Sequence, residues 1–86
     1  MKIYVLTFEP SQANSLVVGA YSSIEKAIED AETWTDGNDE GWKAPARDAW
    51  SREGSYIDEW ENVVAQAKVE GAHNEHALIF ELEVGG

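Results

Sequence analysis

The sequence predicts a small α+β domain with two layers: a three-stranded antiparallel sheet carrying one or two helices on one face, in the order β-β-α-(α)-β. Three observations lead to this fold class. Two short apolar runs near the N-terminus are separated by a segment rich in turn formers. A segment with helical amphipathicity and an N-terminal capping pattern follows them. An alternating segment typical of a strand comes last.

The length of 86 residues predicts a single domain covering residues 1–86, near the lower size limit for a self-sufficient core. Cysteine is absent, so packing must stabilise the fold without disulfides or thiolate-bound metals. No stretch reaches the roughly 20 apolar residues of a membrane span, and the N-terminal segment does not resemble a signal peptide. We therefore expect a cytoplasmic protein.

The first two strands are expected at residues 2–8 ("KIYVLTF") and 16–21 ("LVVGAY"), which are rich in β-branched and aromatic residues. Pro10 and Asn14 favour a loop between them, so the two strands should form an antiparallel hairpin. Gly19 within the second strand indicates a bulge, or a place where a helix or backbone packs closely.

A helix is expected to follow, beginning at a capping box in which Ser22 is the cap and Glu25 the third helical residue. On a helical wheel its apolar side chains span about 120°; they are Ile24, Ala27, Ile28, Ala31 and Trp34. Three glutamates, Glu25, Glu29 and Glu32, lie together beside this stripe. The sequence therefore predicts a buried seam and, next to it, an anionic ridge made of these three glutamates.

The second half of the chain is harder to interpret. Residues 35–41 ("TDGNDEG") should end the helix, and Pro45 can open a short helical turn, but the arrangement of residues 42–54 is not predicted. A second helix is expected over residues 55–68, because its apolar period continues through "NVVAQA". The alternative is a short strand at the beginning of this segment, "SYIDEWE".

The last strand is expected at residues 76–84 ("HALIFELEV"). Leu78, Phe80, Leu82 and Val84 are predicted to face the core. Ile79, Glu81 and Glu83 are predicted to lie on the opposite, solvent-exposed face. The tryptophans divide into two groups. Trp34 and Trp60 lie on predicted apolar arcs and should be buried, whereas Trp42 and Trp50 either cap the core or form an exposed interface anchor.

The segments "MKIYVLT" and "VVGAYSSIEKAIEDAETW" resemble a group of small uncharacterised bacterial and bacteriophage domains. In these domains a hairpin leads into a helix through a "G-x-Y-S-S-x-E-K-A" turn, and a last strand closes the sheet. The resemblance covers roughly residues 1–34. It implies the fold and a phage or mobile-element origin, and it implies no activity.

Charge provides the main functional indication. The formal net charge is −11, and residues 25–62 hold 12 of the 17 acidic side chains. Direct nucleic-acid binding is therefore not expected, because affinity for phosphates comes from clustered Lys and Arg. The charge favours a cationic partner, although solubility alone is an alternative explanation.

Catalytic and metal sites are not predicted. No nucleophile, base and oxyanion donor are brought together by sequence spacing, and no cofactor motif is present. The loop "DGNDEG" starts like a calcium loop, but Arg47 occupies the position that needs a bidentate glutamate. The segment "HNEH" (His73–His76) lacks the further ligands and the fixed spacing of a zinc site.

The sequence thus predicts a non-enzymatic acidic domain that binds the basic surface of a protein, expected to be a host nucleic-acid-handling protein engaged by a phage-encoded mimic of nucleic acid. The predicted partner-binding residues are Glu25, Glu29, Glu32, Asp36, Asp39, Glu40, Trp42 and Trp50. No membrane or direct nucleic-acid partner is expected. The alternative is a structural domain that self-associates, as a homodimer, through a sheet edge or an exposed tryptophan.

Overall fold

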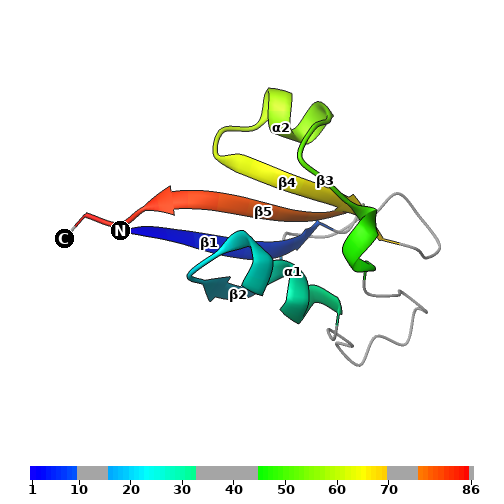
Figure 1. The fold of residues 1–86 in the computed structure, drawn as a ribbon. Helices are drawn as coiled ribbons and strands as arrows, with labels where there is room; N and C mark the ends of the chain where they lie inside the picture. The colour runs from blue at the N-terminus through cyan, green and yellow to red at the C-terminus, as the bar shows by residue number, and fades with distance from the viewer. Residues whose placement is uncertain (10–15, 33–44, 70–75, 86) are drawn as a thin grey trace.

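Five antiparallel strands form a single sheet in the order β2-β1-β5-β4-β3 (Figure 1). The structure is a computed structural model that describes residues 1–9, 16–32, 45–69 and 76–85. Its elements are β1 (Lys2–Glu9), β2 (Leu16–Tyr21), α1 (Ile24–Glu32), the 3-10 helix η1 (Arg47–Ala49), β3 (Trp50–Ser51), α2 (Ser55–Glu59), β4 (Val63–Lys68) and β5 (His76–Glu83). The α+β class is confirmed, but the predicted three-stranded sheet is wrong because β3 and β4 extend it.

The pair formed by the first and last strands lies at the centre of the sheet. β1 and β5 are paired along all eight residues of each strand, from Lys2 opposite Glu83 to Glu9 opposite His76. β2 pairs with the other edge of β1, which confirms the predicted hairpin. β4 pairs with the other edge of β5. The sheet therefore grows outward in both directions from a contact between the two ends of the chain.

α1 covers one face of this sheet, called the inner face below (Figure 1). The buried core there consists of Leu6, Ala65 and Ile79 from the sheet and Ala27 and Ala31 from the helix. The two alanines on the helix, which face Leu6 and Ile79 on the sheet, allow the two layers to approach closely. The core of the domain is thus a helix held against the two central strands and β4.

The predicted apolar seam of the first helix is confirmed for its described residues. Besides the two buried alanines, Ile24 and Ile28 are half-buried and pack against the same core. Trp34 lies outside the described residues. The amphipathic period of this helix was therefore a reliable signal, because its apolar residues have only one sheet face to pack against.

The cap of α1 is shifted by one residue from the prediction. The Ser23 Oγ, and not that of Ser22, accepts the Lys26 backbone N–H at 3.2 Å. Ser23 also supplies the first helical carbonyl oxygen, which accepts from Ala27 N–H at 3.2 Å. With two serines in a row, either can cap the helix, and the structure uses Ser23.

Gly19 marks a bulge, as predicted. The register between β1 and β2 shifts between Leu6, which is opposite Gly19, and Thr7, which is opposite Val17. A Cβ at Gly19 would lie 2.5 Å from the hydroxyl oxygen of Tyr21. The glycine therefore accompanies the irregular pairing, as expected, and the close neighbour is the phenol of Tyr21 and not the expected helix or backbone.

The predicted helix at residues 55–68 is wrong. Only Ser55–Glu59 is helical; the chain then turns through Asn62, which has a φ of +70°, and enters β4. The apolar residues of "NVVAQA" fit a two-residue period as well as a helical one, and pairing of β4 with β5 selects the strand. The alternative placed a strand at the wrong end of the segment.

The predicted orientation of the last strand is also wrong in part. Ile79 is fully buried on the inner face, and Glu81 lies on the same side of the strand. Leu78, Phe80 and Leu82 point to the opposite face, called the outer face below. Glu81 and Glu83 share the side of Ile79 and led to the prediction that this side faces solvent, but Ile79 stands opposite Leu6 beneath α1. The two helices therefore do not share one face: α2 packs on the outer face, beside β4.

The segment after Pro45 confirms the predicted short helical turn. Pro45 is buried, and η1 leads directly into β3 at Trp50. Trp50 stands opposite Ala67 of β4 on the inner face, where its ring packs against the core. This edge strand is only two residues long, which offers little unpaired backbone to another chain.

We expect Gly54→Ala to lower the free energy of unfolding by about 1–3 kcal/mol. Gly54 has a φ of +146°, and a Cβ there would lie 2.5 Å from the side-chain amide of Gln66. That amide oxygen accepts the Tyr56 backbone N–H at 3.1 Å at the start of α2. Urea unfolding followed by circular dichroism measures the loss.

Gly85→Ala is the matched control, because nothing lies within 4 Å of its added Cβ. It should change the free energy of unfolding by less than about 0.5 kcal/mol. Equal stability of the two variants would contradict the backbone conformation at the start of α2.

Candidate functional site

The exposed side of α1 carries the part of the predicted anionic ridge that stays open to solvent. Glu25 and Glu29 lie one helical turn apart and are exposed. None of the salt bridges among the described residues involves either of them. Because Ala27 and Ala31 hold the opposite side of the helix in the core, these two carboxylates are held toward solvent.

Glu32 differs from the other two glutamates of the ridge. Its Oε1 accepts a hydrogen bond from the Nε of Arg47 at 2.7 Å, which links the end of α1 to η1. An ion pair at the surface contributes little to stability, about 1 kcal/mol at most, but it compensates the charge locally. Within the described residues, the uncompensated ridge is therefore Glu25 and Glu29.

The remaining predicted partner-binding residues fall into two groups. Asp36, Asp39, Glu40 and Trp42 lie outside the described residues. Trp50 is described and is half-buried; it packs against both core clusters on the inner face. Of the two roles left open for this tryptophan, the structure shows packing against the core, and a part in an interface stays a prediction.

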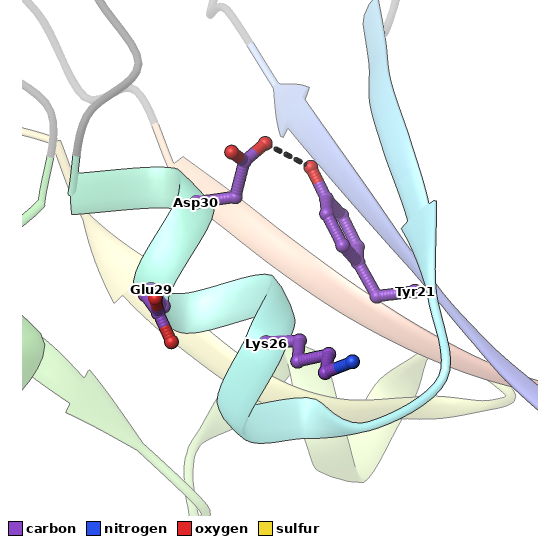
Figure 2. Close-up of a pocket in the computed structure, with 4 residues that line it drawn as sticks. All are labelled: Tyr21, Lys26, Glu29 and Asp30. Atoms are coloured by element: carbon purple, nitrogen blue, oxygen red, sulfur yellow. Dashed lines mark hydrogen bonds between the residues drawn. The ribbon is translucent and has the colours of Figure 1, made fainter.

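A small open cleft lies between the end of β2 and the side of α1 (Figure 2). Its volume is about 300 Å³, and it is lined by Tyr21, Lys26, Glu29 and Asp30. The phenol of Tyr21 points to Asp30 and donates a hydrogen bond to its carboxylate, while Lys26 and Glu29 extend in different directions (Figure 2). The cleft thus brings a strand residue and a helix residue together across nine positions of sequence.

The chemistry of this cleft is that of a structural link. Partial burial, the hydrogen bond to Asp30 and the negative charge of that carboxylate raise the pKa of Tyr21 from 10.0 to about 12. The phenol therefore stays protonated at physiological pH and acts as a donor to Asp30, not as a base or nucleophile. No sequence pattern indicated this pair, because Asp30 lies outside both the seam and the ridge.

An aromatic cluster occupies the outer face. The ring of Tyr56 in α2 meets the ring of Trp60 edge-on, with centroids 5.5 Å apart, and Trp60 lies 6.4 Å from Phe80 of β5. Trp60 is 43% exposed, so its predicted burial is wrong. The prediction failed because it placed Trp60 on the seam of a long helix, whereas the helix ends at residue 59.

His76 belongs to this cluster too. Its Nδ1 is 3.3 Å from the hydroxyl of Tyr56, and the two rings are 4.7 Å apart. His73 and the calcium-like loop at residues 36–41 lie outside the described residues. Among the residues that the structure does describe, no three His, Asp or Glu side chains are grouped as a metal site would require.

Comparison with known proteins identifies no relative: no family model matches the chain, and no curated protein or solved structure matches it either. The helices in the described part of the chain are too short or too polar to cross a lipid bilayer. The surfaces of the molecule are therefore the basis for inferring its function.

We expect the phenol of Tyr21 to titrate near pH 12. Folding raises its pKa, so its contribution to stability is complete below about pH 10 and is lost as the pH rises toward 12. The difference between the tyrosinate absorbance titrations of the wild type and Tyr21→Phe measures this group directly.

The companion variant is Asp30→Asn, which keeps an acceptor but removes the charge. It should lower the pKa of Tyr21 only part of the way, because burial, the largest cause, remains. A difference titration centred at pH 10 in the folded wild type would contradict the contact shown in Figure 2.

Proposed function

We propose that this chain is a non-catalytic domain that binds a basic surface of a partner protein. Its net charge of −11 is the observation that carries this proposal. Three of the described basic side chains are already engaged within the chain: Lys2 with Glu81, Arg47 with Glu32, and Arg52 with a backbone carbonyl. The negative field is therefore only partly compensated internally, and such a field attracts and orients cationic partners.

The exposed side of α1 is the proposed contact surface. Glu25 and Glu29 are about 6 Å apart along the helix axis, at 1.5 Å per residue, a spacing similar to that of phosphates along a nucleic-acid strand. Asp36, Asp39, Glu40 and Trp42 follow α1 in the sequence and remain part of the proposed surface. Trp50 is half-buried and packs against the core, so it contributes to this surface only through the part of the residue that stays exposed.

The class of partner follows from this spacing and from the sequence resemblance. A protein that presents a row of carboxylates can occupy a groove that normally holds phosphates. The resemblance of residues 1–34 to bacterial and bacteriophage domains favours a phage or mobile-element origin. We therefore propose a host nucleic-acid-handling protein as the partner, with this domain acting as an inhibitor or modulator.

The test is capture of proteins from bacterial lysate by the full chain at low and high salt. Retained partners should be released by salt and also by added duplex DNA, which competes for the same basic groove. The double variant Glu25→Gln with Glu29→Gln should lose at least about 80% of the captured protein, because two charges leave the contact surface.

Asp48→Asn with Glu53→Gln is the matched control, since it removes the same charge from two other exposed positions. It should retain most of the captured protein. If both double variants lose the partner equally, total charge and not the surface of α1 causes the binding. Capture that is indifferent to salt and to DNA would reject the proposal.

Self-association is the second candidate, and one observation favours it. β2 is an edge strand of six residues without a charged side chain, and Val17 within it is 71% exposed. Uncharged edges are available for pairing with another strand, although the bulge at Gly19 partly protects this one. The high net charge opposes the association of two copies.

Sedimentation at two salt concentrations separates the two candidates. An edge-paired dimer should persist, or become stronger, at high salt because screening reduces the repulsion between copies. Val17→Lys should then dissociate it by placing a charge at the edge. A chain that is monomeric at both salt concentrations rejects self-association.

A further inference from the structure

The exposed large hydrophobic residues of this protein are concentrated on one side of the sheet. Those in the described part of the chain are Met1, Val17, Trp60, Leu82 and Val84. Leu82 and Val17 point to the outer face by their registers with Ile3 and Thr7. Strand alternation places Met1 and Val84 on the same side, and Trp60 reaches it through its contact with Phe80.

Leu82 has partly exposed neighbours in the two central strands. Ile3 stands opposite Leu82, and Val5 stands opposite Phe80; all but Leu82 are half-buried. α1 lies over the inner face and α2 contacts mainly β4 (Figure 1). The open part of the outer face lies over the start of β1, the end of β2 and the end of β5, because Thr7 and Leu78 farther along the same face are buried. Three strands span about two strand spacings, roughly 10 Å, which is the width of one α-helix.

The border of this surface is acidic on the side of α2. Asp58, Glu59 and Glu61 flank Trp60 and are exposed, and none of them takes part in a salt bridge among the described residues. Lys68 also points to the outer face, and it lies opposite His76 at the far end of β4. The exposed apolar surface is therefore bordered by acidic side chains on the side of α2.

We propose that the outer face binds a cationic amphipathic helix of a partner protein. The apolar side of that helix covers the floor formed by Val5, Phe80 and Leu82, with Trp60 against its flank. Its lysines or arginines lie beside Glu59 and Glu61. The proposal takes from the proposed function only that the partner is a basic protein, and it assigns the contact to a different surface from α1.

The chemistry of the surface selects this occupant over a second copy of the chain. A second copy would bring the same carboxylates to the contact, together with a net charge of −11, and like charges that face each other oppose binding. A strand would add at an edge of the sheet, not on its face. A helix on this face would complete a second layer, as α1 does on the inner face.

The experiment uses the full chain and a labelled synthetic peptide of about four helical turns. The peptide has leucines at i, i+3, i+4 and i+7 and lysines elsewhere, and its comparator is a scrambled peptide of the same composition. Fluorescence anisotropy measures binding. The ordered peptide should bind at least about tenfold more tightly than the scrambled one, because only it presents a single apolar side.

Three variants locate the contact. Leu82→Gln should weaken binding about tenfold, since a leucine that gains burial contributes on this order. Val84→Gln should weaken it less and serves as the second apolar variant if Leu82→Gln does not show the circular dichroism of a folded chain. Glu59→Gln with Glu61→Gln should reduce both the affinity and its dependence on salt.

Glu25→Gln with Glu29→Gln is the control, because these residues lie on α1 over the inner face. It should leave the preference for the ordered over the scrambled peptide unchanged. If this variant alone weakens binding, the peptide occupies the surface of α1; the outer-face inference is then overturned while the proposed function stands.

If lysate capture fails while peptide binding depends on Leu82, the proposed function is overturned and the outer-face inference stands. Equal binding of the scrambled peptide, or a dimer of the free chain that Leu82→Gln dissociates, also overturns the inference.

Discussion

The antiparallel pairing of β1 with β5 is the interaction on which the rest of this fold depends. It joins the two ends of the described chain along eight residue pairs and brings Leu6 and Ile79 together on the inner face. β2 pairs with the free edge of β1, β4 pairs with the free edge of β5, and β3 pairs with β4. Since these contacts are distant in sequence, they form at a high cost in chain entropy and must be supported by burial.

The two faces of the sheet have different roles as a result. The inner face is closed by α1, with alanines at the contact and no charged side chain among the described residues of its buried core. The outer face is covered by α2 mainly beside β4, and it keeps its exposed apolar residues toward the start of β1 and the end of β5. Sheet faces with apolar residues usually pack against another layer, so the incomplete outer layer and the acidic surface of α1 are the two features of the described residues on which the proposals rest.

Sequence patterns predicted the structure correctly where the structure depends on neighbouring residues. The hairpin, the seam of α1 and the bulge at Gly19 were all predicted, because each depends on neighbouring residues and on a single nearby face. The segment at residues 55–68 failed because its apolar spacing fits both a helix and a strand, and pairing with β5 decided the outcome. Trp60 is exposed as a direct consequence, because it lies beyond the end of α2. The orientation of β5 was predicted wrongly for a related reason: alternation defines two sides of a strand, but it does not show which of them α1 covers.

The sequence by itself determined the α+β class, the acidic character, the absence of cysteine chemistry and the glutamates that α1 presents to solvent, since composition and helical period are local properties. Tertiary structure alone decided that Glu32 is paired with Arg47, that Trp50 joins the core and that Tyr21 meets Asp30. It also gathered the exposed hydrophobic residues on the outer face. These features depend on which distant strands pair and on which face a helix covers, and no spacing within one segment encodes that choice.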